Sequence, residues 1–317
     1  FAPDFATAGK INTQLSWVGK LASDGRPILG LDSEELARIV FETSDETVDV
    51  PAHAWTPWFS VFGSMSGFDS LEECYGKYTD RIFAIETGLS SDPGMNWRLS
   101  KLDNISIISN SDSHSLHRIG REANVFDVEP SYRNIMEAIK SRDPEKFIMT
   151  LEFFPEEGKY HFDGHRNCEV IFSPSESKKY NNICPKCGKP LTIGVMNRVE
   201  KLADRGEGFR DPKRVPYKNL IPLDEIIAEA VGMGVGTKRV EAEYENLVKK
   251  LGGELQILLE KSESDLEMAT APMIAEGIMR ARNGRVKIRP GYDGEYGKIQ
   301  IFEENERRGT SAQAKLF

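Results

Sequence analysis

The chain has 317 residues, 39% of them hydrophobic, which is enough material for two or three cored domains. Its net charge is -9, so overall charge does not indicate a nucleic-acid binder, and any such function must depend on local basic segments. No run approaches the ~18 apolar residues of a membrane-spanning helix, and no secretory signal is visible. We therefore expect a cytoplasmic protein without a membrane partner.

The N-terminal half alternates strand-like and helix-like segments. Asp32 and Glu35 have the spacing of a capping box before the helix expected at 31–44. Strands alternating with helices predict a parallel sheet or a β/α barrel. Further helices are expected at 70–79 and 132–142, and strands at 47–54, 81–87, 104–110 and 146–154.

The alternation stops near residue 155, where turn residues and cysteines dominate up to about 192. A basic linker, 205–218, then leads to expected helices at 222–231, 238–251 and 271–283 and a β-like end at 285–302. We accordingly expect an α/β domain at 1–154, a zinc-binding module at 155–205, a helical domain at 206–305 and a flexible tail at 306–317.

Polar side chains follow three of the expected strands. His53, Glu86 and the pair Asp112 and His114 all fall where a strand ends. Chemistry in β/α folds gathers at the carboxyl ends of strands, and imidazole with carboxylate suits zinc, manganese or iron(II). An Asp-x-His pair is equally typical of a capped strand end, and a single histidine of an ordinary loop.

The motifs "PAHAWTP" and "NSDSH" resemble metal-binding motifs of the PHP (polymerase and histidinol phosphatase) domain. "IETGLSSDPGMNWRLS", "YHFDGHRNC" and "CPKCGKPLTIGVMNRVEKLADR" are similar to one branch of it, the endonuclease Q family of DNA repair nucleases. The resemblance implies a PHP-type β/α barrel with catalytic Zn, Mg or Mn ions at His53, Asp112 and His114, and Glu86 as a further ligand. It also implies cleavage of DNA 5′ to uracil, hypoxanthine, xanthine or an abasic site.

One motif of the PHP domain has no match in this sequence. PHP domains open with an H-x-H motif, and nothing before His53 supplies it. We therefore expect only the C-terminal strands of the barrel here, and little activity from this stretch alone. Two alternatives stay open, a PHP phosphatase for a small phosphate ester and a non-catalytic zinc-ribbon protein that binds nucleic acid.

The cysteines predict a structural zinc site. "HRNC" and "CPKC" place His165, Cys168, Cys184 and Cys187 in two knuckles whose spacing suits tetrahedral zinc. His161 is a competing fourth ligand. Gly188 provides the tight turn after the second knuckle, and Cys74 is expected to be a buried thiol in a helix.

Two basic segments are candidates for DNA contact, at 198–218 and 280–289, although charge runs are more often solvated helix ends. The glycines before Lys238 suggest exposed amides able to hold a phosphate, and they fit a plain helix terminus equally well. The final residues, "QAKLF", resemble the start of a sliding-clamp-binding peptide through Gln313, Leu316 and Phe317. The expected DNA contacts are Arg210, Lys213, Arg214, Lys238, Arg239, Arg285 and Lys287. Trp97 joins them as a ring able to stack on a flipped base, although a place in the core is the default expectation for it.

Overall fold

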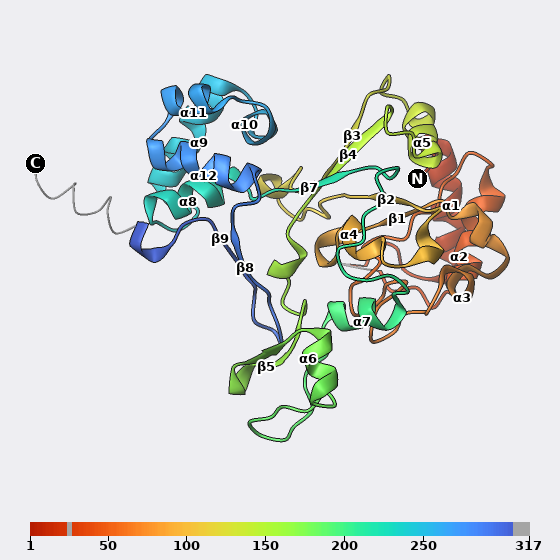
Figure 1. The fold of residues 1–317 in the computed structure, drawn as a ribbon. Helices are drawn as coiled ribbons and strands as arrows, with labels where there is room; N and C mark the ends of the chain where they lie inside the picture. The colour runs from red at the N-terminus through yellow and green to blue at the C-terminus, as the bar shows by residue number, and fades with distance from the viewer. Residues whose placement is uncertain (24–26, 307–317) are drawn as a thin grey trace, which may run out of the picture.

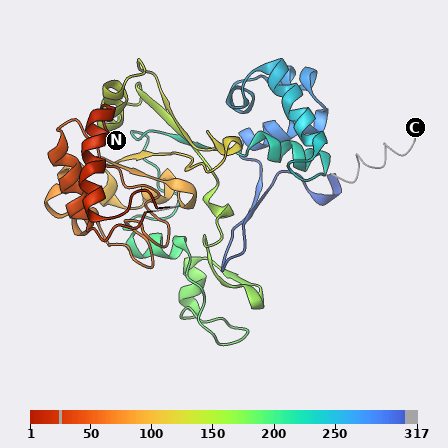
Figure 2. The same cartoon turned by 180° about the vertical axis from the view of Figure 1, so that it is seen from behind.

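A computed structural model describes residues 1–23 and 27–306 of the chain. Its ribbon shows three parts: an α/β body, a helical domain beside it, and a small module that projects below them (Figure 1). The view from behind shows the same three parts and a thin two-stranded ribbon that reaches from the helical domain to the module (Figure 2). The expected clamp-binding tail lies outside the described residues.

The α/β body carries two small sheets. Strands β1 (Ala84–Glu86) and β2 (Ser106–Ile108) are parallel, while β4 (Phe147–Glu152) pairs antiparallel with β3 (Ala123–Phe126) and parallel with β7 (Tyr217–Asn219). These described strands form open sheets rather than a closed barrel. Its helices are α1 (Phe5–Val18), α2 (Ser33–Thr43), α3 (Leu71–Tyr75), α4 (Pro93–Asn96), α5 (Tyr132–Ser141) and α7 (Val195–Leu202), with 3-10 turns η1 (Gly76–Arg81), η2 (Gly88–Ser90), η3 (Ser100–Leu102) and η4 (Leu116–Arg118).

The segment expected to be a strand at 47–54 lies beside β1 without being a strand. The Glu86 amide donates to the Pro51 carbonyl over 3.0 Å, and the Ala54 amide donates to the Glu86 carbonyl over 3.0 Å. Pro51 has no amide to donate, and the left-handed backbone of His53 ends the extended path after these contacts. The prediction of a strand at 47–54 was therefore wrong, although the segment runs beside β1.

The projecting module begins after the 3-10 turn η5 (Pro155–Glu157). It contains the hairpin β5 (Asp163–His165) and β6 (Val170–Phe172), the 3-10 turn η6 (Arg166–Cys168) and helix α6 (Pro174–Lys179). The chain enters and leaves this module at neighbouring positions, where the Val195 amide donates to the Tyr160 carbonyl over 2.7 Å. Helix α7, which the sequence groups with this module, buries Val195 and Val199 in the core of the α/β body instead.

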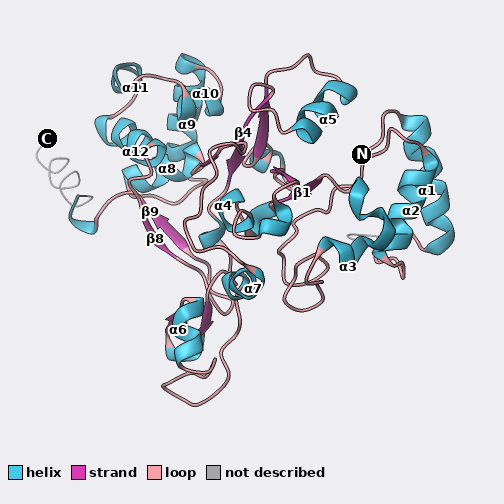
Figure 3. Cartoon of the chain, turned by 45° about the vertical axis from the view of Figure 1, so that its right-hand side comes forward, coloured by secondary structure: helices cyan, strands magenta, loops and turns pink. Residues whose placement is uncertain are grey.

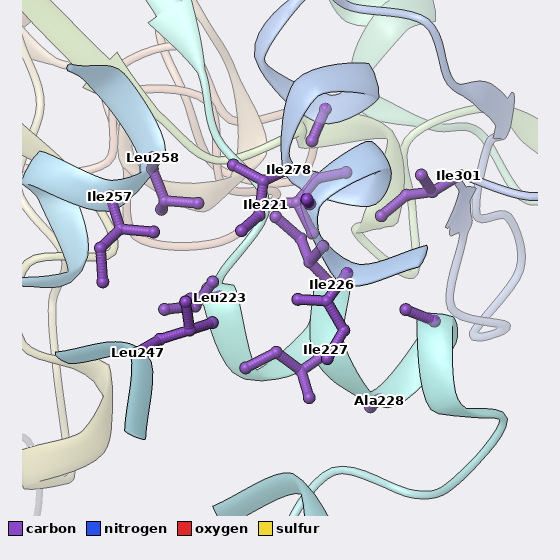
Figure 4. Close-up of a cluster of buried hydrophobic side chains, with 14 of the residues drawn as sticks. Ile221, Leu223, Ile226, Ile227, Ala228, Leu247, Ile257, Leu258, Ile278 and Ile301 are labelled. Atoms are coloured by element: carbon purple, nitrogen blue, oxygen red, sulfur yellow. The ribbon is translucent and has the colours of Figure 1, made fainter. Parts of the chain in front are cut away.

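Helices pack around a continuous apolar core in the third part. Its fully buried side chains include Leu223, Ile226, Ile227 and Leu247 (Figure 4). The helices are α8 (Leu223–Val231), α9 (Lys238–Leu251), α10 (Glu254–Leu259), α11 (Glu263–Ala269) and α12 (Pro272–Arg282).

A two-stranded ribbon of β8 (Lys287–Arg289) and β9 (Lys298–Gln300) connects the helical domain to the projecting module (Figure 3). Tyr292, in the turn of the ribbon, bridges to Phe162, and Asp293 accepts from the Arg166 amide over 2.7 Å. The ribbon therefore fixes the module to the helical domain as well as to the body.

Several expected elements are confirmed, among them α5, α8, α9 and α12. The capping box at Asp32 was wrong: the Asp32 side chain accepts from the Glu34 amide over 2.9 Å, and no reciprocal bond from Glu35 accompanies it because Glu35 pairs with Arg38. In the described part of the chain, no helix has the length and apolarity needed to cross a membrane.

Candidate metal centres and nucleic-acid interface

The predicted catalytic residues lie at the ends of neighbouring segments. His53 follows the segment beside β1, and Asp112 and His114 follow β2, which pairs with β1. His53 is half-buried, whereas Asp112 and His114 are exposed. His53 (φ +35°) and Asp112 (φ +44°) both have left-handed backbones, a conformation that non-glycine residues seldom adopt. Such backbone outliers concentrate at functional sites.

The hydrogen bonds of the two imidazoles orient both rings for metal binding. The Thr56 hydroxyl donates to the His53 carbonyl over 2.7 Å, so its oxygen accepts from His53 Nδ1 at 2.8 Å. His114 Nδ1 lies 2.8 Å from the Asp112 carbonyl, which can only accept. Both rings therefore carry a proton on Nδ1, so Nε2 is the nitrogen through which either ring could bind a metal. Imidazole and carboxylate are donor types that suit a divalent ion.

Glu86 contacts both of these segments. Its Oε2 accepts from the His53 amide over 2.7 Å, and its Oε1 accepts from the Asn110 side chain over 2.7 Å. The side chain is buried, with 8% of its surface exposed. Both carboxylate oxygens of Glu86, the further metal ligand expected from the sequence, thus accept hydrogen bonds from within the protein.

Two further carboxyl groups, those of Glu152 and Glu122, are buried near the ends of these strands, and neither was predicted from the sequence. Glu152, at the end of β4, accepts from the Thr87 hydroxyl over 2.9 Å and from the Ser109 hydroxyl over 3.1 Å. Burial raises its pKa to about 7. Burial, and then the neighbouring charge of Glu152, raise the pKa of Glu122 to about 8. The position of Glu152 at a strand end, in "MTLEFF", was the available signal.

The cysteine cluster is the most converged ligand set. Within residues 1–23 and 27–306, only one group of three or more His, Cys, Asp or Glu side chains has all its ligand atoms within 4.8 Å of one another. Its members are His165, Cys168, Cys184 and Cys187. His161 is instead buried in the module, where burial lowers its pKa to about 4. The arrangement suits a structural zinc ion. In the described residues, the ligand atoms of His53, Asp112 and His114 do not converge in the same way.

The local backbone explains how the second knuckle forms. The Gly188 amide donates to the Cys184 carbonyl over 2.8 Å, and Gly188 has a φ of +74°, where a side chain would be strained. Burial raises the pKa of the Cys184 thiol. Hydrogen bonds from the backbone amides of Cys187 and Lys186 outweigh that effect and lower the pKa to about 6. Cys74 is a buried thiol in α3, as expected.

A cavity of about 960 Å³ lies between the loop after His114 and the helical domain. The loop contributes Arg118 and Arg121, and the helical domain contributes Tyr244 and Leu258. Arg118 forms an ion pair with Glu225 of α8 over 3.0 Å, which joins the two walls. This cavity was not predictable from the sequence because its walls are about a hundred residues apart in the chain.

The candidate DNA contacts divide into exposed and buried residues. Trp97 is buried against Tyr217, with ring centroids 5.4 Å apart, and is a core residue rather than a surface ring. Arg214 pairs with Asp103, and its side chain is 11% exposed, so its charge is locally compensated. Lys287 pairs with Glu303. The remaining candidates are exposed: Arg210, Lys213, Lys238, Arg239 and Arg285.

Comparison with known proteins defines the class. The family model described as the MJ0043 C-terminal domain matches residues 222–285. Over 269 residues the chain is 39% identical to the uncharacterized protein MJ0043 of Methanocaldococcus jannaschii, covering 82% of this chain and 33% of that protein. It is 35% identical to the uncharacterized protein YqxK of Bacillus subtilis, covering 79% of this chain and 60% of that protein. The chain thus spans less than two thirds of both relatives.

The solved structures give the family. The chain superposes on the lesion-specific endonuclease PfuEndoQ of Pyrococcus furiosus with a TM-score of 0.85 and 32% identity, covering 96% of this chain and 74% of that one. A structure of endonuclease Q with a 27-mer duplex substrate, carrying an abasic lesion at the active site, matches with a TM-score of 0.81 and 32% identity over 95% of this chain and 75% of that one. The class is that of mixed α/β proteins with a cysteine-rich module. The chain belongs to the endonuclease Q family.

Proposed function

We propose that this chain is part of a metal-dependent DNA endonuclease that cleaves the phosphodiester on the 5′ side of a deaminated base or an abasic site. The observation that carries the proposal is the pair of histidines at adjacent segment ends, each with Nδ1 engaged in a hydrogen bond within the protein, in a chain similar over 96% of its length to a lesion-specific endonuclease. The substrate classes come from the family resemblance and from the abasic lesion held by one relative.

His53 and His114 would hold divalent ions through Nε2, and Asp112 through its carboxylate. A bound divalent ion would supply Lewis-acid stabilisation of a phosphoryl oxygen and acidify a water molecule. The protein's own contribution is to fix the ring orientations through Thr56 and the Asp112 carbonyl. Because the three groups do not converge in the described residues, we propose that further ligands complete the centre in the full-length protein.

DNA contact is proposed for the exposed basic residues and the cavity beside the loop after His114. Arg210, Lys213, Lys238, Arg239 and Arg285 carry charge into solvent on a chain that is acidic overall. Phosphate contacts of this kind release counterions, so binding should weaken steeply with salt. We propose that the cavity of about 960 Å³, lined by Arg118 and Arg121, accepts part of the DNA.

The test is Asp112→Asn in the full-length protein, which removes a charge and little volume. We expect cleavage of duplexes containing uracil, hypoxanthine or an abasic site to be lost while DNA affinity stays near wild type, because the change acts on the chemical step. Asp127→Asn, also at an exposed position, is the matched control. Normal cleavage by Asp112→Asn in the presence of magnesium or manganese would refute the proposal.

A second candidate is a zinc-ribbon protein that binds nucleic acid without cleaving it. It is favoured by one observation, that the cysteine cluster is the converged ligand set in the described residues. This candidate predicts salt-dependent DNA binding without cleavage of any of the three substrates by the full-length wild-type protein. Cleavage that Asp112→Asn abolishes would exclude it.

A further inference from the structure

A continuous chain of hydrogen bonds connects the backbone at His53 with the segment that leads to Asp112. It begins at the His53 amide, which donates to Glu86 Oε2 over 2.7 Å. Asn110 Nδ2 donates to Glu86 Oε1 over 2.7 Å, and Asn110 Oδ1 lies 3.1 Å from Asn124 Nδ2. Asn124 ends the chain on the backbone of Ser109, through its Oδ1 at 2.9 Å from the amide and its Nδ2 at 2.7 Å from the carbonyl.

The backbone at its two ends fixes the direction of every bond in this chain. Asn124 cannot flip, because its Oδ1 must accept from the Ser109 amide and its Nδ2 must donate to the Ser109 carbonyl. Asn124 therefore donates to Asn110 Oδ1, and Asn110 must donate to Glu86. At the opposite end, the His53 amide can only donate. Position 86 must provide two acceptors, which a carboxylate has and a glutamine side chain lacks.

The residues held by this chain have unusual backbones. His53 adopts φ +35°, and Asp112, two residues after Asn110, adopts φ +44°. Packing contributes on one side, since a Cβ added to Gly88 would lie 2.5 Å from His53 Cβ. Left-handed conformations of residues with side chains persist when the surroundings determine them. Glu86 is the group that bonds to both segments at once.

We infer that Glu86 is a positioning residue of this site: it holds the backbone of His53 and the segment leading to Asp112 in one fixed arrangement, and it does so as a double hydrogen-bond acceptor rather than as a metal ligand. This inference rests on the proposed function, in which His53 and Asp112 bind the metal. It also replaces the expectation that Glu86 is a further ligand of the cluster.

The test is an exchange of acid and amide between two positions. Glu86→Gln removes one required acceptor without changing volume. The double variant Glu86→Gln with Asn110→Asp restores it, because the side-chain amide introduced at position 86 could then accept from His53 and donate to a carboxylate at position 110, which would also accept from Asn124. The double variant has the net charge of the wild type. Asn110→Asp alone would place two carboxylates side by side.

Two measurements on the full-length protein read out the result. Hydrogen exchange of the amides at 51–56 reports on the backbone of His53 without reference to catalysis. Titration with Mn²⁺, together with kcat and KM on an abasic-site duplex, reports on the site. Loss of a group that orients a metal ligand typically costs 10- to 100-fold, so we expect about that loss in Mn²⁺ affinity or kcat for Glu86→Gln and Asn110→Asp, with KM little changed.

If the double variant recovers Mn²⁺ affinity and kcat to within about threefold of wild type, the inference is supported. Wild-type behaviour of Glu86→Gln overturns it. Failure of the double variant to recover also overturns it, because a carboxylate that binds metal directly cannot be moved to position 110. If Asp112→Asn cleaves normally, the proposed function fails, while faster amide exchange at 51–56 in Glu86→Gln and its reversal in the double variant still decide the positioning role.

Discussion

Glu152 should make the α/β body less stable as the pH rises. The side chain is fully buried, and its carboxyl group is bonded to Thr87 and Ser109. Burial raises its pKa to about 7 from an ordinary value of 4.5. Glu152→Gln keeps an acceptor for the two hydroxyl groups and can no longer ionise, so it isolates the contribution of this proton.

The sign and size follow from proton linkage. Between pH 4.5 and 7 the folded protein keeps the Glu152 proton while the unfolded chain has lost it, so the free energy of unfolding falls as the pH rises. Each pKa unit corresponds to about 1.4 kcal/mol, so the full loss is about 3 kcal/mol and is complete above pH 7. Below pH 4.5 both states are protonated, so the free energy of unfolding no longer changes with pH through Glu152.

Urea unfolding followed by tryptophan fluorescence at pH 5 and pH 8 measures this difference. All four tryptophans lie between residues 17 and 97, so the signal reports on the α/β body. We expect the fall in unfolding free energy from pH 5 to pH 8 to be about 3 kcal/mol smaller in Glu152→Gln than in the wild type. Glu137→Gln, exposed on α5, is the control. An equal fall in the wild type and Glu152→Gln would refute the reasoning.

Three further outcomes are expected. Cys184→Ser should lose about one zinc per chain by elemental analysis and increase amide exchange across 162–194, because the small module depends on its metal; retention of the zinc would contradict the ligand assignment. Charge reversal at Arg285 and Arg289, both exposed, should lower duplex affinity and flatten its salt dependence while zinc content is unchanged; an unaltered salt dependence would remove the ribbon from the interface. Leu247→Ala, fully buried in the helical core, should cost about 3 kcal/mol of unfolding free energy, and a cost below about 1 kcal/mol would show that the core collapses around the missing atoms.

Helices with a clear apolar stripe were predictable from the sequence. Helix α9 begins at Lys238 and ends at Leu251, the residues expected, because Val240 and Leu247 repeat at helical spacing and Gly252 ends the helix. The short strands were less well bounded: β2 covers Ser106–Ile108, whereas 104–110 was expected. Apolar composition marks a buried segment, but hydrogen bonding to β1 decides which of its residues form the strand.

The cysteine cluster was predictable because its members are close in sequence. Knuckle spacing selected His165, and the structure places His165, rather than His161, with the three cysteines. The candidate catalytic site was only partly predictable. The endings of separate strands indicated His53 and Asp112, but the role of Glu86 depends on Asn110 and Asn124, whose positions relative to it are set by the sheet.

Basic residues were the least predictable part of the candidate interface. Arg198, Arg205 and Arg214 lie in one basic run, yet each is engaged by the α/β body, Arg198 through the Phe62 carbonyl at 3.0 Å and Arg205 through Asp103. A local sequence does not reveal whether an arginine has an acceptor waiting on a distant segment. The same run therefore contains structural cations and exposed ones such as Arg210.

The closed base of the projecting module has a consequence for how the protein is made. The hydrogen bonds of Val195 and Met196 to Tyr160 and His161 bring together the ends of a single excursion of the chain. His165, Cys168, Cys184 and Cys187 all lie within that excursion, so its contacts are short-range in sequence and can form early. β7, which follows the module in sequence, pairs with β4, which precedes it. During ribosomal synthesis the whole cysteine cluster is therefore available before the strand that completes the flanking sheet has been made.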